Sequence, residues 1–214
     1  MAKSCAPPAV TAYIDKHFAH QSPVQREIRE YTATLPNGQM LTDPDQAALL
    51  SLLVRMAHAT NALEIGTFTG YSALAIASAL PEGGRLTCLD VNPTTSAIAQ
   101  AFWREAGLAE SITLILGPAA ETLKTFQGQP LFDFAFIDAD KEGYDGYYEA
   151  VLPLLKPGAA MLFDNMIRPG VVEGRPVDAA ARAIAALNEK LAADPRVAAQ
   201  LLTIGPGMVL AVKK

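Results

Sequence analysis

Apolar residues occur along the chain in two alternating patterns, short continuous runs and longer stretches with helical spacing. The short runs predict strands over 62–65, 85–89, 111–116, 132–137 and 159–163. The amphipathic or alanine-rich stretches between them predict helices over 71–80, 95–107, 118–127, 144–155 and 178–193. Strands that alternate with helices in this way predict a parallel sheet covered on both faces.

The two ends of the chain depart from this alternation. The runs 199–204 and 208–212 are separated only by Gly205-Pro206-Gly207, which is too short for a parallel crossover and predicts an antiparallel hairpin. Near the start, helical spacing over 10–34 is interrupted at Ser22-Pro23, and a loop over 35–45 precedes a helix over 44–58 capped by Asp43. We predict a single domain, 1–214, with an N-terminal helical cap (1–40) and a binding core (41–214).

Composition and charge narrow the class of ligand. Half of the 214 residues are hydrophobic, the net charge is -5, and lysine and arginine are scattered singly. Proteins that bind nucleic acid usually carry a basic face, so a small-molecule partner is favoured. Cys5 and Cys88 form no CxxC or zinc-like spacing, which favours a reducing, cytoplasmic setting. No apolar run is long enough to span a membrane, and the first residues do not resemble a signal peptide.

Acidic residues mark the ends of four predicted parallel strands. These residues are Glu64, Asp90, Asp138 and the pair Asp164-Asn165. Ligands of open α/β sheets bind beyond the carboxyl ends of the strands. One acid after a strand is usually a helix cap, but four in this position predict a binding site.

The loop after the first strand reads Glu64-Ile-Gly-Thr-Phe-Thr-Gly-Tyr-Ser72. Gly66 permits a tight turn and a close approach of the backbone to a ligand, and the helix start at Tyr71 offers free N–H groups to an anion. Phe68 replaces the middle glycine of the dinucleotide fingerprint, which argues against a pyrophosphate. Asp90 suits the ribose hydroxyls of NAD and of S-adenosylmethionine (SAM) alike, and this loop favours SAM.

Asp138, Asp164 and Asn165 form a third constellation. Their strands are predicted to be neighbours, and neighbouring strands lie about 4.8 Å apart, so the three side chains can share one ion. Carboxylate and amide oxygens suit Mg²⁺ or a similar divalent cation. Lys141 follows closely and could act as a general base, although its position alone fits a solvated lysine equally well.

Four motifs together resemble one known family, the cation-dependent O-methyltransferases. They are the loop 64–72, Leu89-Asp90-Val-Asn, Ile137-Asp138-Ala-Asp140-Lys141 and Phe163-Asp164-Asn165. The resemblance is to the caffeoyl-CoA and catechol O-methyltransferase group, especially its small bacterial members, and extends from about residue 39 to the last strand. It implies a Rossmann-like class I methyltransferase fold: a mostly parallel seven-stranded sheet with a C-terminal antiparallel hairpin and helices on both faces.

The resemblance also implies roles for particular residues. SAM would be held by Thr42, by Glu64, Gly66, Thr67 and Ser72 at its methionine end, by Asp90 at the ribose, by Ala119 at the adenine, and by Asp138, Asp140 and Tyr147. Asp138, Asp164 and Asn165 would bind Mg²⁺, or another divalent cation such as Mn²⁺ or Ca²⁺. Lys141 would be the catalytic base, acting beside Asp138, and the protein would form a homodimer.

We therefore expect a SAM- and metal-dependent O-methyltransferase that acts on a catechol-like or other vicinal-hydroxyl small molecule. One alternative keeps the fold but methylates a hydroxylated uridine in tRNA, against which the missing basic stripe counts. A second is an NAD-dependent oxidoreductase, against which Phe68 counts. A third, a non-catalytic SAM-binding protein, is disfavoured by the metal set and Lys141. The residues that recognise the acceptor do not follow from these motifs.

Overall fold

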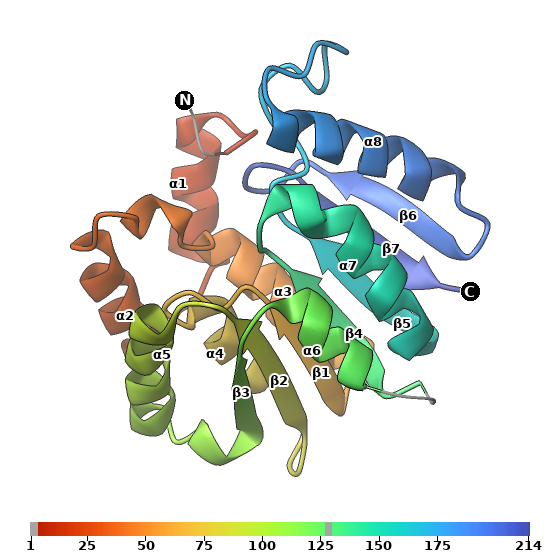
Figure 1. Ribbon diagram of the computed structural model, residues 1–214. Coiled ribbons are helices and arrows are strands. Elements are labelled where there is room, and N and C mark those ends of the chain that lie inside the picture. Colours follow the sequence, from red (N-terminus) through yellow and green to blue (C-terminus); the bar gives the residue numbers. More distant parts are fainter. Residues whose placement is uncertain (1–3, 127–129) are drawn as a thin grey trace.

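A seven-stranded sheet with the strand order β3-β2-β1-β4-β5-β7-β6 forms the centre of the protein (Figure 1). The computed structural model describes residues 4–126 and 130–214. The strands are β1 (Asn61–Ile65), β2 (Arg85–Asp90), β3 (Ile112–Leu116), β4 (Phe132–Ile137), β5 (Leu155–Phe163), β6 (Val197–Leu202) and β7 (Met208–Lys213). β7 pairs antiparallel with both β5 and β6, and the other pairs are parallel. The predicted parallel sheet with a terminal antiparallel hairpin is therefore confirmed.

Helices cover both faces of the sheet, as predicted (Figure 1). One face carries α3 (Pro44–Met56), α4 (Tyr71–Ala77) and α5 (Pro93–Glu105), with α1 (Pro8–His17) and α2 (Pro23–Ala33) packed outside them. The other carries α6 (Ala119–Thr125), α7 (Tyr144–Val151) and α8 (Ala179–Ala193). An apolar cluster lies on each face of the sheet. Successive residues of β4 pack into one cluster and then the other, because side chains alternate across a strand. Phe134 and Phe136 join one apolar cluster, and Ala135 and Ile137 join the other.

Proline and short polar side chains fix where the early helices begin. α1, α2 and α3 each have proline at a first helical position, where its missing N–H costs nothing. Asp43 is the N-cap of α3 as predicted, and Gln46 returns a hydrogen bond to its backbone N–H. The break at Ser22-Pro23 separates α1 from α2, since Ser22 caps the second helix. The predicted loop 35–45 contains a short 3₁₀ turn, Gly38–Met40.

The prediction of a helix over 144–155 was wrong at its end. α7 stops at Val151, a 3₁₀ turn follows over Leu152–Leu154, and β5 begins at Leu155 rather than at residue 159. Pro153 lacks the N–H that a continuing α-helix needs. Leu155 instead pairs with Phe132, ahead of a register shift in the strand pair.

Other boundaries differ by a few residues. α4 ends at Ala77, short of residue 80, and β6 lies two residues earlier than predicted. α5 begins at Pro93 rather than Thr95 because Asn92 accepts hydrogen bonds from the first N–H groups. The predicted end of the 118–127 helix, Gln127, lies outside the described residues. Among the described helices, none is both long and apolar enough to cross a membrane.

Candidate functional site

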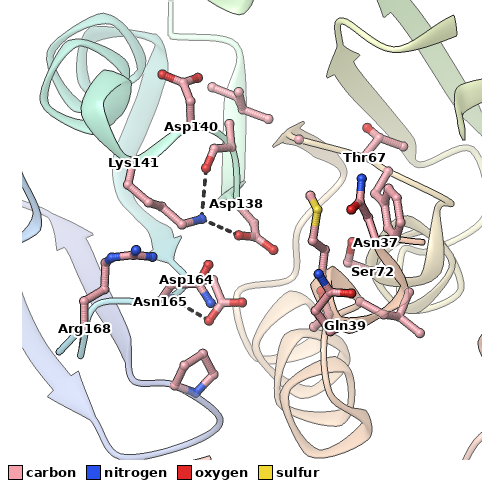
Figure 2. A pocket seen from close by; sticks show the side chains of 18 of the residues that line it. Asn37, Gln39, Thr67, Ser72, Asp138, Asp140, Lys141, Asp164, Asn165 and Arg168 are labelled. Carbon is pink, nitrogen blue, oxygen red and sulfur yellow. Dashed lines mark hydrogen bonds and ion pairs between the residues drawn. The ribbon is translucent and has the colours of Figure 1, made fainter. Parts of the chain in front are cut away.

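A cavity of about 1310 Å³ opens at the carboxyl ends of β2, β1, β4 and β5, which are adjacent and parallel. Figure 2 shows Thr67 and Ser72 on one side of it, and Asp138, Lys141 and Arg168 on the other. The predicted site residues that line it are Thr42, Gly66, Thr67, Ser72, Asp90, Ala119, Asp138, Asp140, Lys141, Tyr147, Asp164 and Asn165. Glu64 is the exception, since its side chain is fully buried. Residues of the separate sequence motifs therefore line one cavity at the same edge of the sheet.

The first loop is held tightly against its neighbours. Gly66 has φ +89°, and a side chain there would collide with the backbone carbonyl of Asp138. Gly66 thus lets the loop approach the backbone of Asp138, directly after β4, while it also lines the cavity. Asp90 Oδ2 accepts the N–H groups of Thr67 and Phe68, both at 2.8 Å. Asp90 therefore fixes the loop in addition to lining the cavity.

Glu64 lies directly beneath this loop as a buried carboxyl group. Cys88 Sγ donates to Glu64 Oε2 at 3.3 Å, whereas Glu64 Oε1 is buried without a hydrogen-bond partner among the described residues. Burial raises the pKa of Glu64 to about 7, and the neighbouring polar side chains of Ser72, Cys88 and Thr67 offset part of this rise. Thr67 Oγ1 also lacks a partner within the described chain. Glu64 and Thr67, two of the predicted cofactor residues, thus each keep one buried polar atom without a hydrogen bond in the described chain.

Lys141 is held in place by three oxygens. Its Nζ donates to Asp138 Oδ1 at 2.7 Å, to the Ala139 carbonyl at 2.9 Å and to Tyr144 Oη at 2.7 Å. An ammonium group has three hydrogens, so these contacts use all of them. Lys141 is therefore fixed at the cavity by its neighbours and is not the exposed lysine that its position also allowed.

Tyr144 is a site residue that the sequence analysis missed. Its ring is fully buried, and its hydroxyl lies 3.1 Å from the carbonyls of both Ile137 and Asp164. Burial raises its pKa well above the ordinary value, assisted by the charges of Asp138 and Asp164, so the phenol stays neutral. Its spacing of three residues from Lys141 was the available signal, because such residues meet on one side of a helix.

Asp164 and Asp138 stand side by side, as the strand order predicted. The backbone N–H of Asp164 donates to Ile137, which places the residues after β4 and β5 at matching positions. Only 2% of Asp164 is exposed, and burial together with the negative charge of Asp138 raises its pKa. Gln46 Nε2 and the Asn165 N–H both donate to Asp164 Oδ1, each at 2.6 Å. Gln46 was also missed, since it lies 118 residues away in sequence.

Asn165 adopts a backbone conformation that is unusual outside glycine. Its φ is +59°, in the left-handed region that asparagine tolerates better than most residues. This turn follows β5 directly and places Asn165 at the cavity wall, beside Asp164. The position therefore suits asparagine for backbone reasons as well as for its amide oxygen.

Comparison with known proteins assigns this site to a family. A family model described as O-methyltransferase matches residues 15–214. The chain belongs to this O-methyltransferase family. It is 36% identical to a probable caffeoyl-CoA O-methyltransferase of Dictyostelium discoideum, over 96% of this chain and 91% of that protein. It is also 37% identical to the catechol O-methyltransferase domain-containing protein 1 of mouse, over 94% of this chain and 78% of that one.

Solved structures show the same relationship. The O-methyltransferase of Bacillus cereus, solved in complex with S-adenosylhomocysteine (SAH), has a TM-score of 0.87 and 33% identity, over 96% of this chain and 97% of that one. TomG of Streptomyces achromogenes, solved with SAM, has the same TM-score and 30% identity, over 96% of each chain. This chain is therefore a SAM-dependent O-methyltransferase, and the NAD-dependent alternative was wrong. These relatives give no support to the tRNA alternative.

The donor set of the O-methyltransferase fits a divalent cation. Asp138 and Asp164 place two carboxylates together at the cavity, with Asn165 beside them, and Asp164 is almost fully buried. Two adjacent acids at this depth repel each other, which a cation would relieve. Within the described ranges, no three His, Cys, Asp or Glu side chains form a metal-like group. A cation here would therefore depend on the Asn165 amide as its third protein ligand.

Two further segments of the O-methyltransferase line the same cavity. Tyr147 Oη donates to Asp140 Oδ1 at 2.6 Å, which fixes two of the predicted cofactor residues relative to each other.

The sequence motifs did not identify the residues that line the cavity before α3 or in the loop after β5. These are Asn37, Gln39, Met40 and Leu41 in the first group, and Ile167, Arg168, Pro169, Gly170, Val172, Glu173 and Val177 in the second.

Proposed function

We propose that this enzyme transfers the methyl group of SAM to one of two adjacent hydroxyls of a catechol-like small molecule. We further propose that it requires a divalent cation such as Mg²⁺, bound by Asp138, Asp164 and Asn165. One observation carries the proposal: the loop after β1 and the pair Asp138–Asp164 line the same cavity. A cofactor on that loop and an acceptor on those carboxylates would face each other.

The cofactor half of the cavity is built for a zwitterionic, ribose-bearing molecule. Glu64 lies behind the cavity wall as a buried carboxyl, whose charge would favour the positive ammonium of the methionine end without touching it. Thr67 and Ser72 stand between Glu64 and the cavity. Asp90 would receive the ribose hydroxyls, and the remaining contacts would come from the residues assigned by resemblance: Thr42, Gly66, Ala119, Asp138, Asp140 and Tyr147.

The acceptor half provides the proton chemistry. When bound, a divalent cation supplies Lewis-acid stabilisation of a hydroxyl in its anionic form. Asp138 would hold both that cation and Lys141, whose Nζ donates to Asp138 Oδ1 at 2.7 Å. Lys141 would first release an ammonium proton to solvent, and the neutral amine would then receive the acceptor's hydroxyl proton. The methyl group moves from sulfur to oxygen, and the sulfonium becomes a neutral sulfide. Fixing the two reactants in line supplies much of the rate.

A methyl-transfer screen tests the proposal. Catechols, caffeoyl derivatives and hydroxylated nucleosides would be tested with SAM and Mg²⁺, with and without EDTA. We expect transfer to vicinal diols that stops with EDTA, and loss of that activity in Asp138→Ala. Asp145→Asn, which removes an exposed acid paired with Lys190, is the control that should retain activity. Full activity of Asp138→Ala in the presence of the chelator would disprove the metal requirement.

A further inference from the structure

Arg168 lies in the wall of the acceptor half of the cavity. It follows Asn165 by three residues, in the loop that leaves β5. Figure 2 shows its side chain on the same side of the cavity as Lys141 and Asn165. The wall residue beside the proposed metal ligands is therefore a cation.

Most of the hydrogen-bonding capacity of Arg168 is unused within the described residues. A guanidinium has five N–H donors. Arg168 Nη2 forms an ion pair with Asp178 Oδ2 at 3.5 Å, a long distance for a direct contact. Asp178 is already the N-cap of α8, where its Oδ1 accepts the Ala181 N–H at 2.6 Å. Arg168 Nε is buried and has no partner among the described residues, so the donors that a ligand in the cavity can reach are those of the two terminal nitrogens.

The surroundings of Arg168 are suited to an aromatic ring. Ile167, Pro169, Val172 and Val177 line the same part of the cavity, and the last two have 71% and 65% of their surface exposed. Glu173 also lines the cavity but is exposed to solvent, whereas Arg168 is half-buried. A partly desolvated cation between apolar walls favours a ligand that combines an apolar body with an anionic group.

We infer that the acceptor carries an anionic group, a carboxylate or a phosphate, which the Arg168 guanidinium binds while the vicinal hydroxyls face Asp164 and Asn165. This inference rests on the proposed function and narrows its substrate class to acidic catechols. Planar bidentate pairing with oxyanions is the interaction for which arginine is best suited. Arg168 would thus be a specificity residue and would take no part in the methyl transfer.

The test compares matched acceptors that differ only in charge. Protocatechuate and caffeate would be compared with their primary amides, and a catechol with a phosphate monoester on its side chain and both ring hydroxyls free would separate phosphate from carboxylate recognition. In the wild-type enzyme we expect kcat/KM to favour an acid over its amide by about tenfold or more, the effect of one charge-assisted hydrogen bond. Arg168→Gln should abolish this preference by raising KM for the acid, with kcat for the amide little changed. Arg168→Lys should restore part of it.

Arg182→Gln is the matched control. Arg182 is an exposed residue of α8 that also acts on Asp178 but does not line the cavity. It should retain the wild-type preference, which separates recognition by Arg168 from a general change in charge. Calorimetric titration of SAH-loaded protein with protocatechuate gives a second readout, in which Arg168→Gln should weaken binding by about tenfold.

Two results would overturn the inference in distinguishable ways. In the first, acids and amides are methylated equally well, or Arg168→Gln lowers kcat/KM for both equally. Arg168 then does not discriminate between charged and neutral acceptors, and the proposed function stands. If no catechol of either charge is methylated in the presence of Mg²⁺, the proposed function is wrong and the inference falls with it. A preference limited to the side-chain phosphate monoester would assign phosphate as the recognised group.

Discussion

Gln46 Nε2 donates to Asp164 Oδ1 across 2.6 Å, which connects the first turn of α3 to the end of β5. The Gln46 side chain is fully buried, and its Oε1 accepts the backbone N–H of Asp43. Gly205 leaves room for this amide, because a side chain at that position would collide with it. Gln46 is thereby fixed from two sides and holds one orientation of the Asp164 carboxylate.

Gln46→Leu should weaken Mg²⁺ binding by about tenfold or more, the usual effect of removing a partner that orients a metal ligand. Asp164 would keep its place but lose the donor that sets its direction. At saturating Mg²⁺ the rate of methyl transfer should recover most of its wild-type value. Titration of activity with Mg²⁺ and the Mg²⁺-dependent rise in melting temperature would measure the change independently.

The control for this prediction is Gln25→Leu. Gln25 occupies the equivalent capping position of α2, where its Oε1 accepts the Ser22 N–H at 2.9 Å. This variant loses a capping hydrogen bond, as Gln46→Leu does, without touching a proposed metal ligand. Equal Mg²⁺ dependence in the two variants would show that Gln46 acts only on helix stability.

Gly66→Ala should destabilise the protein by about 3 kcal/mol or more, because the new methyl group would collide with the Asp138 carbonyl in addition to straining the backbone. Urea denaturation would measure the loss. Gly83→Ala separates the two causes: its φ is also positive, at +77°, but nothing lies within 4 Å of the added atom. In that variant the free energy of unfolding should fall only by the cost of backbone strain, about 1–2 kcal/mol. Similar losses in the two variants would contradict the close contact between the loop and β4.

The predicted strand order indicated which acidic residues would meet at one edge of the sheet. Asp90, Asp138 and Asp164 each follow or end an apolar run, and the ends of parallel strands meet at one edge of a sheet. Strand order does not predict contacts between side chains that are far apart in the sequence. Gln46 reads as an ordinary capping residue of α3, and its bond to Asp164 exists only because α3 lies against the end of β5.

The start of β5 was predicted wrongly for a different reason. The start of β5 was assigned to the preceding helix because 144–155 keeps helical spacing, and spacing does not register the missing N–H of Pro153. The same limit applies to Arg168, which stands in an irregular loop where no periodicity indicates which way a side chain points.

Lys141→Met should lower methyl transfer by about 10²–10⁴-fold, the usual contribution of a general base, while SAM binding remains close to wild type. The methionine keeps much of the apolar length of the side chain but cannot donate to Asp138 or accept a proton. Single-turnover rates would measure the chemical step, and titration with SAM would measure binding. Lys124→Met, which removes an exposed lysine paired with Glu121, is the control. An unchanged single-turnover rate in Lys141→Met would exclude a proton-transfer role.

Glu64→Gln should change how stability depends on pH in the cofactor-free protein. The pKa of Glu64 is about 7 in the folded protein because the group is fully buried, against an ordinary value of 4.5. The unfolded chain therefore releases the proton first as pH rises. The contribution of Glu64 to stability is fully present below pH 4.5, falls between the two values, and is lost above pH 7.

Glutamine cannot ionise, so the variant escapes this loss. The difference in unfolding free energy between Glu64→Gln and wild type should thus shift in favour of the variant by about 3 kcal/mol between roughly pH 4.5 and pH 7. Asp164, whose pKa is also raised by burial, is present in both proteins, so its contribution cancels in the difference. Urea denaturation at several pH values measures it. A difference that stays constant with pH would mean that Glu64 is already ionised in the folded, cofactor-free protein and that a buried donor compensates its charge.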